Sequence, residues 1–130
     1  MRKIVLVIHT SVDGFVADEN GRLNHLVQSP ENLDFVCGLT EDADAVLAGR
    51  IYFESLDSYW PDVYRNPNAT VSEVRYSNWY NGAEKIVLSR SLSQNEKSGI
   101  TVLSEDIEMN LLHLKNKKGK DILLFGSQSV

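Results

Sequence analysis

Four short aliphatic runs, spaced along the chain and each ending in a polar turn, limit most strongly the folds open to this sequence. They cover residues 4–8, 45–48, 85–89 and 121–125. The run at residues 4–8 is continuous rather than alternating, which is typical of a central strand covered on both faces. Helix-like segments separate the runs, and such alternation favours a mostly parallel sheet with helices on its faces. We therefore expect an α/β fold of three layers.

Local signals place the helices between these runs. Ser29 and Pro30 form a typical helix start, a capping hydroxyl followed by proline in the first turn, and Gly38 is the expected end of that helix. A capping box at residues 70–73 predicts another helix start. That helix is expected to end near residue 82. Residues 57–68 are predicted to be irregular. Two further helices are expected, at residues 50–56 and 107–118, and one more short strand at residues 101–103.

The composition indicates one folded domain over residues 1–130, since 42% of the residues are hydrophobic. The net charge of −5 argues against a general binder of nucleic acid or of anionic membranes. Cys37 is the only cysteine, which excludes an intrachain disulfide and a cysteine-built metal site. No segment has the length of a membrane span or the pattern of a signal peptide, so we expect a cytoplasmic protein.

The turn at Gly49 and Arg50 is the strongest local indication of a binding site. A strand that enters a helix through glycine directs free backbone N–H groups, and the positive end of the helix dipole, at one point. Arg50 adds a planar guanidinium that suits phosphate oxygens. The alternative is steric, because many such turns carry glycine for space and an arginine that only solvates the rim.

Two other strands end in turns of similar chemistry, Ser89-Arg90 and Gly126-Ser127. The carboxyl ends of parallel strands share one edge of a sheet, where α/β proteins commonly bind ligands. The three turns are therefore expected to line one cleft and to hold a dinucleotide. The sequence contains neither a Walker motif nor G-x-G-x-x-G, which counts against an unrelated nucleotide-binding module.

Four motifs taken together resemble one family. They are Ser11-Val-Asp-Gly-Phe-Val-Ala17, Leu47-Ala-Gly-Arg-Ile-Tyr-Phe-Glu54, Lys85-Ile-Val-Leu-Ser-Arg90 and Ile122-Leu-Leu-Phe-Gly-Ser127. In this order, and over essentially the whole chain, the sequence resembles the dihydrofolate reductase-like superfamily. Within it, the resemblance is to the RibD C-terminal domain, the reductase domain of bacterial riboflavin biosynthesis proteins. The resemblance implies a mixed sheet flanked by helices, with NADPH bound across the strand ends.

The resemblance also implies a reaction and a set of cofactor contacts. The reaction would be hydride transfer from NADPH to a small heterocyclic or sugar-phosphate substrate, as in 5-amino-6-(5-phosphoribosylamino)uracil reductases or dihydrofolate reductases. Phosphates would lie at the Gly-Arg turn, adenosine beside the Ser-Arg turn, and the pyrophosphate at the last turn. The loop at about residues 16–23 would close over the nicotinamide. The expected cofactor-binding residues are Val16, Ala17, Gly49, Arg50, Ile51, Ser89, Arg90, Gly126 and Ser127.

Two carboxylates, Asp13 and Asp34, are candidate catalytic residues on the substrate side. Asp13 follows the first strand, where it could bind polar groups of a substrate, although we favour the alternative that it stabilises its own turn. Asp34 lies on the helix where dihydrofolate reductases keep the acid that holds the pterin. Helical spacing leaves the Asp34 carboxylate equally able to face solvent. If no carboxylate faces the pocket, folate reduction is disfavoured.

Three departures from the family pattern support a rival hypothesis. Tyr52 stands where the family often has threonine, and Ser127 stands where it has a second glycine. The chain also stops at Val130, where family members usually continue into another helix and further strands. We therefore expect C-terminal elements to be missing and the sheet edge to favour a homodimer. The rival to a reductase is a non-catalytic relative of the same fold that binds a nucleotide or dimerises.

Overall fold

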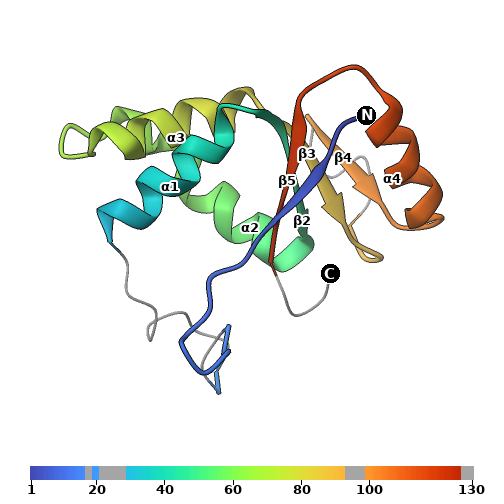
Figure 1. Ribbon diagram of the computed structural model, residues 1–130, viewed down its shortest axis with the longest axis horizontal. Helices are drawn as coiled ribbons and strands as arrows, with labels where there is room; N and C mark the ends of the chain where they lie inside the picture. The colour runs from blue at the N-terminus through green and yellow to red at the C-terminus, as the bar shows by residue number, and fades with distance from the viewer. Residues whose placement is uncertain (17–18, 21–28, 93–98, 127–130) are drawn as a thin grey trace.

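The computed structural model describes residues 1–16, 19–20, 29–92 and 99–126. Within these ranges, strands and helices alternate along the chain (Figure 1). None of the helices there is long and apolar enough to cross a membrane. The elements are β1 (Ile4–Val7), α1 (Pro30–Thr40), β2 (Ala43–Gly49), α2 (Arg50–Tyr59), the 3-10 helix η1 (Trp60–Arg65), α3 (Val71–Gly82), β3 (Glu84–Leu88), β4 (Ile100–Leu103), α4 (Ile107–Asn116) and β5 (Asp121–Phe125).

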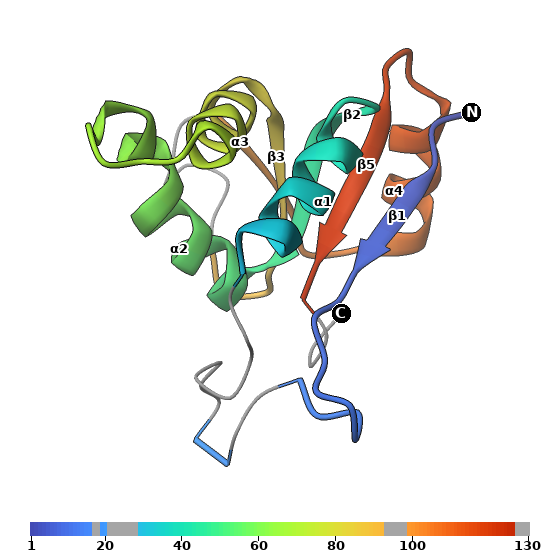
Figure 2. The same cartoon turned by 60° about the vertical axis from the view of Figure 1, so that its left-hand side comes forward.

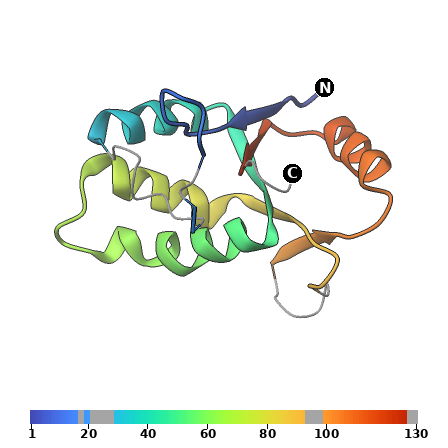
Figure 3. The same cartoon turned by 90° about the horizontal axis from the view of Figure 1, so that it is seen from below.

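The strands form one sheet in the order β1-β5-β2-β3-β4, and every pairing among these described strands is parallel. All of them therefore point the same way, which gives the sheet an amino edge and a carboxyl edge. Helices α1, α2 and α3 lie on one side of the sheet and α4 lies on the other (Figure 2). The view from below shows the three layers (Figure 3). The predicted α/β class with helices on both faces is confirmed.

The position of β1 differs from the prediction. Among the described strands β1 is an edge strand, paired only with β5. Leu6 and Ile8 are 55% and 43% exposed, so the prediction of a central strand covered on both faces is wrong for these residues. A run of aliphatic residues does not by itself distinguish an edge strand from a central one, because an edge strand also pairs through backbone hydrogen bonds with one neighbouring strand.

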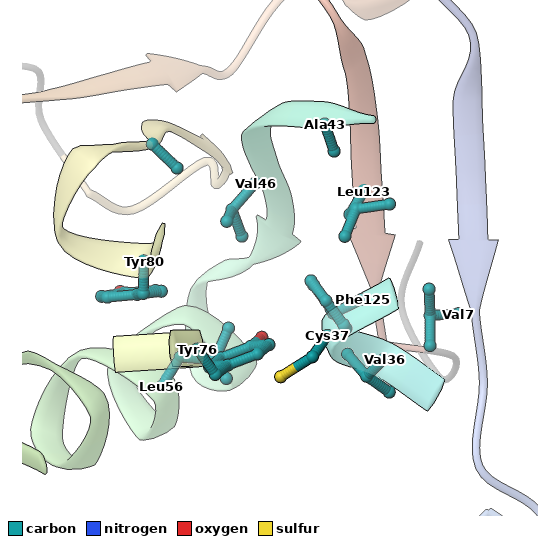
Figure 4. Close-up of a cluster of buried hydrophobic side chains, with 11 residues drawn as sticks. Val7, Val36, Cys37, Ala43, Val46, Leu56, Tyr76, Tyr80, Leu123 and Phe125 are labelled. Carbon is teal, nitrogen blue, oxygen red and sulfur yellow. The ribbon is translucent and has the colours of Figure 1, made fainter. Parts of the chain in front are cut away.

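The first hydrophobic core lies between the sheet and the helices α1, α2 and α3. Figure 4 shows Val46 of β2, together with Leu123 and Phe125 of β5, facing Cys37 of α1 and Tyr76 of α3. The opposite face of the same strands packs on α4. That second core consists of Ala45, Leu47, Ile86, Leu103, Leu114 and Ile122. Strand side chains alternate between the two cores, as the period of a β-strand requires.

Two predicted boundaries are wrong. Gly38 lies inside α1, which continues to Thr40. The Thr40 hydroxyl is buried and donates a hydrogen bond to the Cys37 carbonyl at 2.6 Å, which binds the last turn to the helix. Residues 57–65 are helical rather than irregular, because α2 continues to Tyr59 and η1 follows it. Pro61 lies in the first turn of η1, where its missing N–H leaves no helical hydrogen bond unmade.

The segment η1 is held by a residue that is distant in the sequence. The Ser77 hydroxyl, fully buried on α3, donates to the Trp60 carbonyl at 2.7 Å and accepts from the Tyr64 N–H at 3.0 Å. The start of α3 is as predicted, since the Thr70 hydroxyl accepts from the Glu73 N–H at 3.2 Å. The local cap was therefore predictable, whereas the contact between helices was not.

A buried guanidinium joins several segments at the amino edge of the sheet. The Arg2 side chain, 4% exposed, donates to Asp44 Oδ1 at 2.6 Å. It also donates to the carbonyls of Lys120 at 2.6 Å and Leu114 at 3.4 Å. The other carboxylate oxygen of Asp44 accepts from the Lys120 N–H at 3.0 Å. Gly119 passes close to this pair, because an added Cβ would come within 3.0 Å of Asp44 Oδ2. The region has no room for a side chain there.

Replacing Asp44 with alanine should destabilise the protein by about 2–4 kcal/mol, because the buried Arg2 guanidinium loses its anionic partner. Urea unfolding followed by circular dichroism measures this change. The control is Asp62→Ala, which removes the carboxylate of an exposed pair 3.9 Å from Arg65. That control should change the unfolding free energy by less than about 0.5 kcal/mol. Equal effects of the two substitutions would contradict a structural role for the Arg2–Asp44 pair.

Two tyrosines of α3, Tyr76 and Tyr80, are buried in the first core. Burial raises the pKa of both hydroxyls well above the ordinary value. The Asp57 carboxylate, which accepts the Tyr80 hydrogen bond at 3.1 Å, raises the Tyr80 pKa further. A hydroxyl whose pKa is raised by folding stabilises the folded protein fully below the unfolded pKa, and this contribution is lost as the pH rises above it.

The unfolding free energy should therefore fall as the pH rises above about 10, where unfolded tyrosine ionises. Tyr80→Phe should make that fall shallower, by up to about 1.4 kcal/mol per pH unit, since it removes one such hydroxyl. Urea midpoints measured between pH 9 and about 11 give the slope, which is independent of the constant loss of the Asp57 hydrogen bond. Tyr59→Phe, which alters an exposed tyrosine, is the matched control. Identical slopes for the wild type and Tyr80→Phe would contradict the expected linkage.

Candidate functional site

The three predicted turns lie side by side at the carboxyl edge. Strands β5, β2 and β3 are consecutive in the sheet, with Ala48 opposite Phe125 and Gly49 opposite Leu88. The turns that follow these strands therefore begin next to one another. This arrangement agrees with the expectation that they share one edge. Two of the predicted cofactor residues, Ala17 and Ser127, lie outside the described residues.

The first turn of α2 offers backbone N–H groups and a charge. Gly49 is the N-cap, and no side chain of the described residues caps the helix. The N–H groups of the first turn are thus open to an anion, at the positive end of the helix dipole. Ile51, in the same turn, is 74% exposed. The Arg50 guanidinium already has a partner, because its Nη1 donates to both carboxylate oxygens of Glu54, at 3.3 and 3.2 Å. An anion at Arg50 must compete with Glu54.

Gly126 begins the turn after β5 with φ +112, a conformation that favours glycine. A Cβ at this position would meet Cβ and Cγ of Tyr52 at 4.0 Å, so the backbone passes directly beside the first turn of α2. The Tyr52 ring is also parallel to the Phe125 ring, with centroids 6.3 Å apart. Two distant segments of the chain, α2 and the end of β5, are thereby packed together at the carboxyl edge.

The turn after β3 has a serine with a structural role and an arginine that forms no ion pair within the described part of the chain. The Ser89 hydroxyl accepts from the N–H groups of Ser91 at 3.2 Å and Leu92 at 3.0 Å. The Ser89 N–H donates to the Leu103 carbonyl at 3.1 Å. Arg90 is exposed and makes no ion pair with any residue that the structure describes. Of the two, Arg90 is the group that is open to a ligand.

The loop after β1 is closed by its own hydrogen bonds. The Ser11 hydroxyl donates to Asp13 Oδ1 at 2.6 Å and accepts from the Phe15 N–H at 3.0 Å. Gly14, at φ +90, completes the turn. Asp13 thus supports its turn, the role that the sequence favoured, and a contact with substrate stays a prediction. Val16, predicted to meet the cofactor, is half-buried at the end of the described part of this loop.

Asp34 lies on the exposed side of the contact between α1 and α3. Its carboxylate accepts a hydrogen bond from the Ser72 hydroxyl of α3. A second link between these helices joins Arg75 to Glu41 at 3.1 Å. The structure therefore gives Asp34 a structural partner. Its role as the acid that holds the substrate stays a prediction, in competition with this contact.

Sequence reasoning missed Glu54 and the setting of Tyr52. The pairing of Arg50 with Glu54 was readable, because residues four apart on a helix are neighbours and opposite charges there attract. The setting of Tyr52 was not readable, because the ring contacts Phe125, which is distant in the sequence. No group of three metal-binding side chains occurs in the part of the chain that the structure describes.

A cavity of about 510 Å³ opens at the amino ends of β3 and β4, away from the three turns. Its only cationic side chain among the described lining residues, Lys85, donates to the carbonyls of Tyr80 at 2.6 Å and Ala83 at 3.0 Å. These are carbonyls at the end of α3, which a cation commonly satisfies. Lys85 therefore caps the C-terminal end of α3, and we assign no ligand to the cavity.

The Asp34–Ser72 contact should appear as a coupling in a double-mutant cycle. Asp34→Ala and Ser72→Ala should be non-additive by about 0.5–1 kcal/mol in urea unfolding, because each removes the same hydrogen bond. Ser72→Ala combined with Glu31→Ala, on the first turn of α1, should be additive. A coupling of zero for the first pair would contradict the contact and would leave Asp34 available to a substrate.

Solved structures of similar fold are reductases. A diaminohydroxyphosphoribosylaminopyrimidine deaminase/5-amino-6-(5-phosphoribosylamino)uracil reductase from Thermotoga maritima aligns with a TM-score of 0.59 and 18% identity, over 97% of this chain and 39% of that one. Schistosoma mansoni dihydrofolate reductase aligns with a TM-score of 0.56 and 17% identity, over 97% of this chain and 62% of that one. Enterococcus faecalis dihydrofolate reductase, complexed with NADP(H) and RAB-propyl, aligns with a TM-score of 0.52 and 18% identity, over 98% of this chain and 60% of that one.

Sequence comparison identifies the family. The protein YyaP of Bacillus subtilis (strain 168), described as uncharacterized, is 27% identical over 129 residues, which are 99% of this chain and 65% of YyaP. The chain thus spans less than two thirds of the length of this relative. The RibD C-terminal domain family matches residues 2–130. The dihydrofolate reductase-like fold and the match over nearly the whole sequence agree, and the chain belongs to the RibD C-terminal domain family.

Proposed function

We propose that this protein is an NADPH-dependent reductase that transfers a hydride to a small heterocyclic or sugar-phosphate substrate. The observation that carries the proposal is the adjacency of three turns, at Gly49-Arg50, Ser89-Arg90 and Gly126, along consecutive strand ends. The family and the fold, which reductases share, support it. NADPH would supply the hydride and carry the difficult chemistry.

The chain's own residues would bind and orient the cofactor. The uncapped N–H groups at the start of α2 suit phosphate oxygens, and Arg50 would exchange Glu54 for phosphate. Gly126 would let the backbone approach the pyrophosphate, since a glycine presents no side chain. The exposed Arg90, beside Ser89 at the adenosine end, suits the 2′-phosphate that distinguishes NADPH from NADH. The loop that begins at Val16 would cover the nicotinamide.

The substrate is proposed by class. The deaminase/reductase of Thermotoga maritima is a 5-amino-6-(5-phosphoribosylamino)uracil reductase and the other two neighbours are dihydrofolate reductases. A pyrimidine is favoured over a folate here, because Asp34, the α1 carboxylate that would hold a pterin, accepts a hydrogen bond from Ser72. Asp13 remains a second candidate for a substrate contact.

Arg50→Ala should weaken NADPH binding by about 1–3 kcal/mol, because charge-assisted contacts to phosphate are lost. Glu54→Gln should strengthen binding by about 0.5 kcal/mol, because the guanidinium no longer has a competing carboxylate. Calorimetric titration of the purified chain with NADPH measures both. Arg65→Ala, on the exposed side of η1, is the control and should leave the affinity unchanged. An unaltered affinity in Arg50→Ala would contradict the phosphate assignment.

We further propose that the chain associates as a homodimer, because β1 and β4 each have only one neighbour among the described strands. The mass in solution, recorded by light scattering alongside the titration, decides this point. A folded chain that binds no NADPH would favour the rival, a non-catalytic relative of the same fold.

A further inference from the structure

Two tyrosine hydroxyls near the carboxyl edge, those of Tyr52 and Tyr76, make no hydrogen bond with any described residue. This is unusual, because a buried tyrosine hydroxyl normally finds a partner. Tyr76 is only 3% exposed. No fully enclosed side-chain nitrogen or oxygen of the described residues lacks a partner, so the Tyr76 oxygen must border space that solvent can enter. The buried ring therefore presents an open hydroxyl.

The two tyrosines meet around Phe125. Figure 4 shows the Tyr76 oxygen directed from α3 towards Cys37 of α1 and Phe125 of β5. Tyr52 lies parallel to the same Phe125 ring, at 6.3 Å, and is near enough for its charge to raise the Tyr76 pKa. Gly126, where the last predicted cofactor turn begins, is beside Tyr52. This tyrosine pair thus adjoins the place where the proposed cofactor would pass the end of β5.

The tyrosine pair packs in a largely apolar environment, and the charges that act on the Cys37 thiol are those of Arg75 and Asp34. The core cluster that contains Tyr76, and against which Tyr52 packs, consists of apolar and aromatic side chains with Cys37. The Cys37 thiol already donates to the Ser72 carbonyl at 3.3 Å. Tyrosine hydroxyls are protonated at neutral pH and can donate hydrogen bonds, and burial raises the pKa of both further. An apolar wall with a few fixed polar groups is the usual construction of a small-molecule site.

We propose that Tyr52 and Tyr76 form a hydrogen-bonding subsite for an uncharged carbonyl or ring-nitrogen edge of a heterocyclic substrate. The inference rests on the proposed reductase function and narrows its substrate class. A neutral hydroxyl donates to a carbonyl oxygen without selecting a positively charged ring, whereas a carboxylate such as Asp34 favours a protonated one. Desolvated hydroxyls also discriminate strongly against analogues that leave them unpaired.

The test uses 5,6-diaminouracil, a neutral pyrimidine without ribose or phosphate, titrated calorimetrically into the full chain with and without NADPH. Tyr52→Phe and Tyr76→Phe should each weaken its binding by about fivefold to tenfold, because each removes one hydrogen bond and keeps the ring. The NADPH affinity of Tyr76→Phe should equal that of the wild type. Tyr52 adjoins the cofactor turn at Gly126, so Tyr52→Phe is judged by pyrimidine binding in the absence of NADPH. Tyr59→Phe is the matched control, because Tyr59 is on the same helix as Tyr52 and is 57% exposed. It should bind the pyrimidine as the wild type does.

Two results would overturn the subsite: no binding of 5,6-diaminouracil to the wild type at millimolar concentration, or equal affinity in the wild type and the double phenylalanine variant. Circular dichroism melting verifies that the variants fold cooperatively. The NADPH titration tests the proposed reductase function independently of the pyrimidine titration, which tests the subsite. A chain that fails to bind NADPH but binds the pyrimidine through both tyrosines would sink the reductase proposal and support the subsite.

Discussion

The buried guanidinium of Arg2 holds several segments together at the amino edge of the sheet. It links the segment before β1 to a carbonyl of α4, to the Lys120 carbonyl just before β5 and to Asp44 of β2. The pairing of β2 with β5 shifts register between Ala43 and Ala45, where Asp44 lies, and then runs in step to Ala48 opposite Phe125. The ion pair therefore lies where this register begins, at the opposite end of the strands from the proposed binding turns.

Much of the fold was predictable because its signals are local. Aliphatic runs located the strands, and the hydroxyls of Ser29 and Thr70 located two helix starts, as their cap hydrogen bonds confirm. Two of the failures involve distant partners, whereas the misplaced end of α1 involves only the local Thr40–Cys37 contact. The helical course of η1 depends on Ser77, and the exposure of Leu6 depends on which strands flank β1. Neither kind of information is present in a short window of sequence.

Some features of the candidate site were likewise predictable from local sequence, and others depend on how distant elements pack. The sequence predicted which turns would share an edge, because strand direction alone determines that, and it predicted the local role of Asp13. It did not predict that Asp34 would meet Ser72, since the rotation of α1 against α3 depends on the packing of both helices. The tyrosine pair was hidden for the same reason. Tyr52 and Tyr76 belong to different helices, and they come near one another because Tyr76 lies in, and Tyr52 packs against, the core cluster that contains Phe125.

The contact between Arg50 and Glu54 has a consequence for selectivity. Arg50 carries its own tethered counter-ion, one turn along the helix. An anion that binds Nη1 competes with a carboxylate that cannot diffuse away, so this competitor remains present at any dilution. A polyanion that also engages N–H groups of the first turn of α2 makes more contacts than a small monovalent anion does. The tethered carboxylate therefore favours the polyanion.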